Sequence, residues 1–216
     1  EPARIVTPSS ARSDDDLPFV PRADTARSSA LPSGVTGADV GTLVHAVMES
    51  LDLNRPGAVA ETTRAVAISS GLPEEAASVA AAIIEGAFRS PVLDRARGAA
   101  LVWRELPFCL ARDGATIEGK MDLVFEEDGG LVIVDYKTDV LGDGGTAELR
   151  EHYRGQAQAY GLALAAVARR PVKEVVLFFM RGPKEEPIPV DADPESVERG
   201  LVALVSGAST TARTPS

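Results

Sequence analysis

Residues 115–138, which read ATIEGKMDLVFEEDGGLVIVDYKT, decide the fold of this chain. Two strand-like segments flank the dipeptide Asp128-Gly129, and that dipeptide is a strong signal for a tight β-hairpin. A loop of two residues or of four residues at this point gives the same pairing, whereas a loop of three would shift it by one. With a loop of two or four residues, Asp122 lies directly opposite Asp135, on one face of two neighbouring strands.

A second dipeptide of the same kind, Asp113-Gly114, extends the pairing to a third strand. Its register places Glu105 beside Asp122. Lys137 lies two residues beyond Asp135 and therefore shares its face. The pattern predicts a row of three carboxylates across three adjacent strands, with a lysine next to it.

Facing carboxylates repel one another, so something must offset the negative charge of this row. A divalent cation, a raised pKa or a lysine partner would do so, and Lys120 and Lys137 both flank the row. An exposed face neutralised by lysines therefore stays open as an explanation. The apolar run Leu131-Val132-Ile133-Val134 favours a functional site, because it is typical of a central strand that is buried on both faces.

Carboxylates in this arrangement suit metal-dependent hydrolysis of phosphodiester bonds. Their hard oxygens match Mg²⁺, which keeps water and substrate phosphate as its remaining ligands. A bound cation acidifies water and offsets charge on the phosphate, and a nearby lysine can orient the attacking water. The expected reaction is direct attack by water, without a covalent intermediate.

Periodicity and turn signals predict the remaining elements. Apolar residues recur at three- and four-residue steps over 37–51, which predicts a helix capped by Thr36 or Asp39. The same criteria predict further helices at about 56–70, 73–88, 90–96, 146–169 and 194–205, and strands at 101–111, 115–126, 131–137 and 172–180. The order predicts an α/β domain over 37–205, with a mixed central sheet flanked by helices: a three-strand meander plus a further strand, after an N-terminal helical segment. Residues 1–36 are expected to be a poorly ordered linker or arm, and 206–216 a polar tail.

Composition excludes several classes of protein. A formal net charge of −10 argues against a protein that simply coats nucleic acid. The single cysteine, Cys109, excludes an intrachain disulfide and a four-cysteine iron–sulfur cluster, and it fits a reducing compartment. No apolar run reaches the roughly 18 residues of a membrane span, and no signal peptide is apparent. The missing initiator methionine fits a piece of a longer protein.

Five motifs resemble the RecB-type branch of the PD-(D/E)xK nuclease superfamily, in order and in spacing. They cover about 37–205 of the chain. They are Gly41-Thr42-Leu43-Val44-His45, Arg104-Glu105-Leu106-Pro107-Phe108, Gly119-Lys120-Met121-Asp122, Val134-Asp135-Tyr136-Lys137-Thr138, and the Gln-x-x-x-Tyr motif from Gln156 to Tyr160.

The resemblance implies roles for individual residues. His45, Asp122, Asp135 and the backbone carbonyl of Tyr136 would hold the catalytic metal, and Lys137 would be the catalytic lysine. Glu105 would be a metal ligand or would hold Lys120 or Lys137. Gln156 and Tyr160 would line the site and meet the DNA strand. The residues themselves, not the resemblance, add Tyr153, which lies at helical spacing from these two, and Arg154, which lies in a basic segment that could contact the DNA backbone.

The resemblance also implies cofactors and partners. The expected metal is Mg²⁺, for which Mn²⁺ can substitute, and no iron–sulfur cluster is expected. The branch often forms the C-terminal nuclease domain of AddA/RecB-like helicase–nucleases, which act on double-strand breaks. The expected partners are DNA and helicase domains in the same polypeptide or in a partner subunit. No nucleotide-binding Gly-x-x-x-x-Gly-Lys-[Ser/Thr] loop occurs here, so any motor would lie outside this chain. The expected location is the bacterial cytoplasm, at the nucleoid.

Three alternatives remain open on the sequence alone. The chain could be a catalytically silent nuclease-like module that guides DNA or assembles a complex. It could also be a free-standing repair nuclease. For His45, a lone histidine among Val44, Val47 and Met48 is more often a buried core residue than a metal ligand, and only the other motifs favour the ligand.

Overall fold

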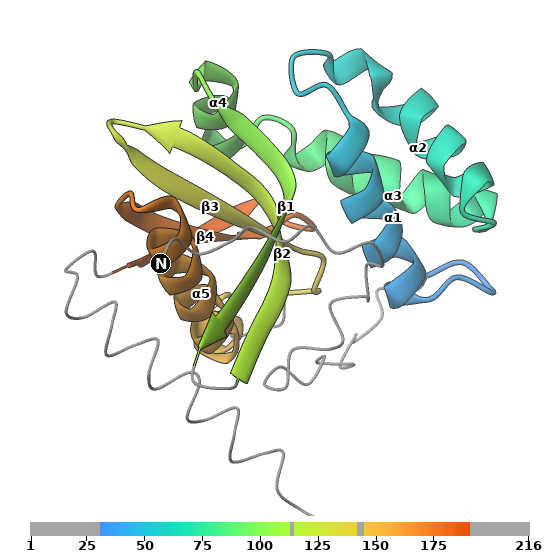
Figure 1. The fold of residues 1–216 in the computed structure, drawn as a ribbon. Helices are drawn as coiled ribbons and strands as arrows, with labels where there is room; N and C mark the ends of the chain where they lie inside the picture. Colours follow the sequence, from blue (N-terminus) through green and yellow to red (C-terminus); the bar gives the residue numbers. More distant parts are fainter. Residues whose placement is uncertain (1–30, 113–114, 142–144, 191–216) are drawn as a thin grey trace, which may run out of the picture.

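A five-stranded mixed sheet lies at the centre of the structure (Figure 1). The computed structural model describes residues 31–112, 115–141 and 145–190. The strands are β1 (Val102–Arg112), β2 (Ala115–Glu127), β3 (Gly130–Lys137), β4 (Val172–Phe179) and β5 (Lys184–Pro189), and they lie side by side in chain order. Only β3 and β4 are parallel; the other neighbours are antiparallel. The α/β class and the mixed sheet are confirmed.

Strand β3 is the central strand that its apolar sequence predicts. All eight of its residues are buried, and it is hydrogen-bonded to β2 on one side and to β4 on the other. Its side chains alternate between the two faces. Val132, Val134 and Tyr136 pack with the N-terminal helices, whereas Leu131 and Ile133 pack with the helix that connects β3 to β4.

The predicted strand registers are confirmed for the observed residue pairs of both hairpins, which do not include Asp122 with Asp135 or Glu105 with Asp122. Leu123 lies opposite Val134 in β2–β3, and Arg104 lies opposite Leu123 in β1–β2. The β2–β3 turn has positive φ angles of 49° at Asp128 and 76° at Gly129, as a type I′ turn requires. Asp122 and Asp135 are each one position beyond the Leu123–Val134 pair.

Glu105 departs from the regular strand that the sequence predicts. Its φ of 46° is in the left-handed region, which is strained for a residue with a side chain. Its neighbours keep the predicted register, with Arg104 opposite Leu123 and Leu106 opposite Met121. The distortion is therefore confined to one residue, next to Asp122.

Helices cover both faces of the sheet (Figure 1). On one face, α1 (Gly37–Ser50), α3 (Glu74–Ala87) and α4 (Pro91–Gly98) share a hydrophobic cluster with the sheet. Helix α2 (Val59–Ser69), which follows a short 3₁₀ turn (Pro56–Ala58), packs against α1 and α3. The other face packs against α5 (Ala147–Ala168). Thr36 and Asp39 cap α1 reciprocally, so both predicted capping residues take part. No single helix in the described ranges is long and apolar enough to cross a membrane, and α3 with α4 reaches the length only across a 76° bend.

The sequence reasoning missed strand β5. Its residues include Pro187 and Pro189 and three charged side chains, which hide the strand pattern. Among the described strands it pairs with β4 alone, at an edge of the sheet, where proline is tolerated. The helix expected at 194–205 lies outside the described residues, as do residues 1–30 and the expected tail at 206–216.

Helix α4 is fastened to the sheet by a charged network around Glu127. Arg95 of α4 donates two hydrogen bonds to Glu127, at 2.8 and 2.7 Å, and one to Glu174, and Lys173 donates a further one to Glu127. These hydrogen bonds from Arg95, against a smaller opposing effect of burial, hold the pKa of Glu127 at about 2. Because the pKa is lowered, the network stabilises the fold above pH 4.5 and this contribution is lost as the pH falls towards 2.

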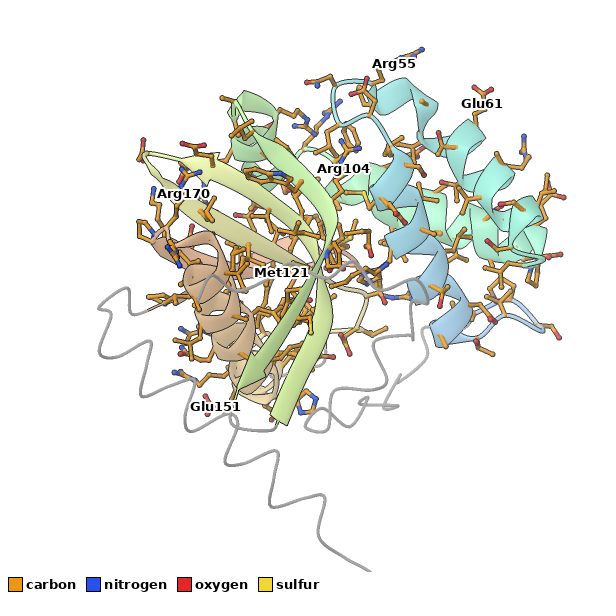
Figure 2. All side chains as sticks on the ribbon, in the orientation of Figure 1. Arg55, Glu61, Arg104, Met121, Glu151 and Arg170 are labelled. Carbon is orange, nitrogen blue, oxygen red and sulfur yellow. The ribbon has the colours of Figure 1, made fainter. Side chains whose placement is uncertain are left out.

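We expect Glu127→Gln to lower the free energy of unfolding by about 1–3 kcal/mol at pH 7, the range for charge-assisted hydrogen bonds. The difference from the wild type should shrink as the pH falls below 4.5. Urea denaturation at several pH values measures both effects. Glu61→Gln, on the exposed side of α2 in Figure 2, is the matched control. An equal loss of stability in both variants would contradict the assignment.

Candidate active site

The candidate active site lies where β2 and β3 pass between α1 and α5. Met121 of β2, labelled near the middle of Figure 2, marks this level of the sheet, whereas Glu151 and Arg170 lie at the periphery. Asp122, Asp135 and Lys137 are the charged residues that are buried here, with exposed fractions of 7%, 5% and 9%. Buried charges require partners, and the structure supplies one for each.

Asp122 connects the sheet to helix α1. One of its oxygens lies 2.9 Å from Nδ1 of His45, and the other accepts a 2.6 Å hydrogen bond from the backbone N–H of Tyr136. A Cβ at Gly41 would come within 3.1 Å of Thr138 Oγ1, so a glycine here lets α1 approach the end of β3 closely. The Gly-x-x-x-His spacing then presents His45, one turn further along, to Asp122.

Asp135 and Lys137 form the second charged pair of the site. Lys137 Nζ lies 2.8 Å from Asp135 Oδ2 and donates a 2.8 Å hydrogen bond to Gln156 Oε1 on α5. Asp135 Oδ2 is enclosed, and among the described residues it makes this ion pair but no well-aligned hydrogen bond. A buried carboxylate oxygen with spare acceptor capacity suits a metal ligand.

Glu105 and Lys120 form the third pair, with Nζ and Oε2 2.5 Å apart. Lysine partners, one of the explanations left open for the predicted carboxylate row, are therefore present. Each of the three acids lies beside its own cationic group, two of which are lysines and one a histidine. Of the two roles left open for Glu105, the structure shows the contact with Lys120.

Three of these side chains can also converge on one ion. Ligand atoms of His45, Glu105 and Asp122 all lie within 4.8 Å of one another. Asp135 is not in this set, since its carboxylate lies against Lys137. The geometry thus brings together the predicted ligands His45 and Asp122 and Glu105, for which a ligand role was left open.

Burial and pairing move the pKa values of the site in opposite directions. Burial lowers the pKa of His45, but the charge and hydrogen bond of Asp122 outweigh it and raise that pKa to about 9. Burial also acts to raise the pKa of Asp122, yet His45 and the Tyr136 N–H lower it overall. The pKa values of Asp135 and Glu105 are both raised, chiefly by burial. At neutral pH, without metal, His45 is therefore an imidazolium next to the Asp122 carboxylate.

The remaining predicted side chains all come from helix α5, and all but Arg154 point into the site. Gln156 contacts Lys137 and donates a 3.1 Å hydrogen bond to the hydroxyl of Tyr160. The ring of Tyr153 lies under the Lys137 ammonium. Arg154 instead pairs with Glu151 on the outside of the helix, and its side chain is 47% exposed. Its predicted contact with DNA stays a prediction.

Sequence reasoning missed two supports of the site. Asp139 accepts a 3.1 Å hydrogen bond from the hydroxyl of Tyr153, and Arg181 donates one of 2.6 Å to the carbonyl of Thr138. Both contacts hold the chain that follows Lys137. Asp139, two residues beyond Lys137, could have been noticed in the sequence, whereas nothing in the sequence pointed to Arg181, which lies in the turn between β4 and β5.

Comparison with known proteins shows the family of the chain. The profile of the PD-(D/E)XK nuclease superfamily matches residues 20–212. The chain is 35% identical over 195 residues to an ATP-dependent helicase/nuclease protein of Desulforudis audaxviator (strain MP104C), covering 79% of this chain and 16% of that protein. It is 36% identical over 162 residues to the protein of the same name from Acetivibrio thermocellus, covering 68% and 13%.

The fold also matches a solved structure. A crystal structure from Eubacterium rectale, provisionally named an exonuclease, superimposes with a TM-score of 0.53 at 15% identity, covering 83% of this chain and 67% of that one. At this identity the likeness concerns the fold. The chain spans about 13–16% of the length of the two curated relatives. Because the superfamily profile matches most of its length, the chain belongs to the PD-(D/E)XK nuclease superfamily.

Proposed function

We propose that this chain is the nuclease module of a DNA helicase–nuclease and that it hydrolyses phosphodiester bonds with Mg²⁺, or with Mn²⁺ in its place. The observation that carries the proposal is the convergence of buried acids, a histidine and a lysine at one end of a central strand. An inert scaffold would not need to bury Asp122, Asp135 and Lys137 together. Burying these charges costs desolvation free energy, and such clusters of buried charges are typical of sites that bind ions and substrates.

The donor set fits a hard divalent cation. Asp122 and Glu105 offer carboxylate oxygens and His45 an imidazole nitrogen within 4.8 Å of one another, and Asp135 has a buried oxygen with spare acceptor capacity. Carboxylates suit Mg²⁺ and Mn²⁺. His45, Asp122 and Asp135, with the backbone carbonyl of Tyr136, are the proposed ligands, and Glu105 is a further ligand or keeps Lys120 in place.

The chain's own residues divide the remaining work. When bound, the cation supplies Lewis acidity that lowers the pKa of water and offsets charge on the phosphodiester. Lys137 orients the attacking water and stabilises the negative charge that develops on phosphorus. Gln156 holds Lys137 from α5, and Gln156, Tyr160, Tyr153 and Arg154 are proposed to line the path of the strand.

Delivery of the DNA strand is proposed to come from helicase domains. The net charge of −10 makes this chain a poor collector of DNA on its own. The relatives named above are much longer than this chain, and their names join helicase to nuclease. We propose a role in the resection of double-strand breaks, in the bacterial cytoplasm at the nucleoid.

Metal binding is expected to depend on pH through His45. A metal ligand must be a neutral imidazole, so the His45 proton has to leave when the metal binds. With a His45 pKa of about 9, we expect release of roughly one proton per metal at pH 7.5, and affinity that rises about tenfold per pH unit up to pH 9. Calorimetry of Mn²⁺ binding in buffers of different ionisation enthalpy measures the proton count. The same slope in His45→Gln would contradict the assignment.

A cleavage assay tests the proposed function as a whole. End-labelled single- and double-stranded DNA is incubated with the chain and with Mg²⁺, Mn²⁺ or EDTA. We expect cleavage that needs either metal and stops with EDTA, and the product ladder then distinguishes exonuclease from endonuclease action. Saturating DNA replaces delivery by the helicase domains, so a folded chain that binds metal and cuts neither substrate at saturating DNA would contradict an active nuclease and favour the silent module.

A further inference from the structure

Within the part of the chain that the structure describes, the Lys137 ammonium makes three close contacts, two with oxygens and one with an aromatic ring. Asp135 Oδ2 and Gln156 Oε1 each lie 2.8 Å from Nζ. The third neighbour is the ring of Tyr153, whose centroid lies 3.8 Å from Nζ. The lysine side chain is 11% exposed, so little water competes with these contacts.

Tyr153 is itself fixed at two points. The residue is 9% exposed within the cluster between α5 and the sheet, and its hydroxyl donates a 3.1 Å hydrogen bond to Asp139 Oδ2. Asp139 follows Lys137 by two residues in the chain. Tyr153 therefore contacts the end of β3 twice, through its ring at Lys137 and through its hydroxyl at Asp139.

The contact with the ring differs physically from the two contacts with oxygen. The face of an aromatic ring carries partial negative charge and attracts an ammonium group, more strongly when water is excluded. Asp135 is also a proposed metal ligand, so its charge would be shared with the cation. The ring of Tyr153 can hold the ammonium without taking part in that competition.

We propose that Tyr153 is a positioning residue that holds the Lys137 ammonium in its working place through the face of its aromatic ring. The proposal rests on the proposed nuclease function, because Tyr153 would affect catalysis only by holding Lys137, the proposed catalytic lysine. It assigns the effect to the ring, while the hydroxyl only anchors the ring to Asp139. A tyrosine that served as core packing alone would make any ring or aliphatic side chain of similar size equivalent.

A series of ring substitutions separates these two roles. Phenylalanine and its mono-, di- and trifluorinated analogues keep nearly the same volume while the negative charge on the ring face declines. We expect Tyr153→Phe to keep kcat within about threefold and each added fluorine to lower it further, whereas Tyr153→Leu should lose about tenfold to thirtyfold. KM for DNA and Mn²⁺ affinity should stay within about twofold throughout.

The metal-free protein offers a second readout that does not depend on activity. An aromatic ring shields the protons of a group on its face, so the ε-methylene protons of Lys137 should resonate upfield of ordinary lysines in wild type. The shift should persist in Tyr153→Phe and vanish in Tyr153→Leu. Glu148→Gln, an exposed change on the same helix, should leave both the shift and kcat unchanged.

The two measurements distinguish failure of this inference from failure of the proposed function. A wild type that cuts DNA while fluorination leaves kcat unchanged, or an effect on KM alone, would overturn the positioning role. An ordinary chemical shift for Lys137 in wild type would overturn the contact. A wild type that cuts no DNA would overturn the proposed function, and the Lys137 shift would still decide whether the ring holds the ammonium.

Discussion

Asp122→Asn is expected to abolish divalent-metal binding at the candidate site and to reduce DNA cleavage by about a thousandfold or more, since a catalytic metal supplies several kcal/mol of transition-state stabilisation. The physical reason is that Asp122 is a proposed metal ligand and also holds the neighbouring groups of the site in place. It pairs with His45 and accepts the Tyr136 N–H, so a neutral amide weakens the cation site while nearly keeping the shape.

Calorimetry with Mn²⁺ and single-turnover cleavage measure the two losses. Asp94→Asn is the matched control, because its carboxylate is 66% exposed on α4 and pairs with Arg97 rather than with a residue of the site. Circular dichroism should show that both variants are folded. Full metal affinity in Asp122→Asn would show that the cation binds elsewhere and that the assignment of the site is wrong.

Lys137→Ala is expected to separate catalysis from metal binding. The loss of a general acid–base or electrostatic group of this kind lowers the rate by about a hundredfold to ten-thousandfold. Mn²⁺ affinity should be retained or increased, because Asp135 is then free of its ion pair. The variant also serves as the control for a contaminating nuclease in the preparation.

Single-turnover cleavage and Mn²⁺ titration on the same protein sample check this prediction. Lys184→Ala, at the exposed start of β5, removes a lysine of equal charge and should leave both quantities unchanged. Cleavage that survives in Lys137→Ala at the wild-type rate would rule out the catalytic role of this lysine. Loss of metal binding together with activity would instead indicate a structural role.

The core of the site could be predicted from the sequence because hairpin pairing is a local property. The Asp128-Gly129 turn alone determines which residues of β2 and β3 are opposite, and the observed Leu123–Val134 pair follows from it. The burial of β3 on both faces could be predicted for a similar reason, since a continuous apolar run needs cover on each side.

The rest of the site depends on contacts that no local pattern encodes. The left-handed backbone at Glu105 and the hydrogen bond from Arg181 to Thr138 both arise from packing between elements far apart in the chain. Helical spacing could place Tyr153 on the same face of α5 as Gln156, but only the folded chain shows its ring against Lys137. The prolines and charged residues of β5 obscured its strand pattern in the sequence, and such a strand is tolerated because it lies at the edge of the sheet.

Anomalous diffraction from crystals of this chain soaked in Mn²⁺ tests the proposed metal site most directly, because it locates the ion without assumptions about activity. We expect an anomalous peak for a Mn²⁺ ion bound by Asp122, Asp135 and His45, with the carbonyl of Tyr136 among its ligands. We expect no such peak in crystals of Asp122→Asn. The ligand set would also decide whether Glu105 touches the ion. Wild-type crystals soaked at saturating Mn²⁺ with no peak at these residues, or with a peak only elsewhere, would contradict the account.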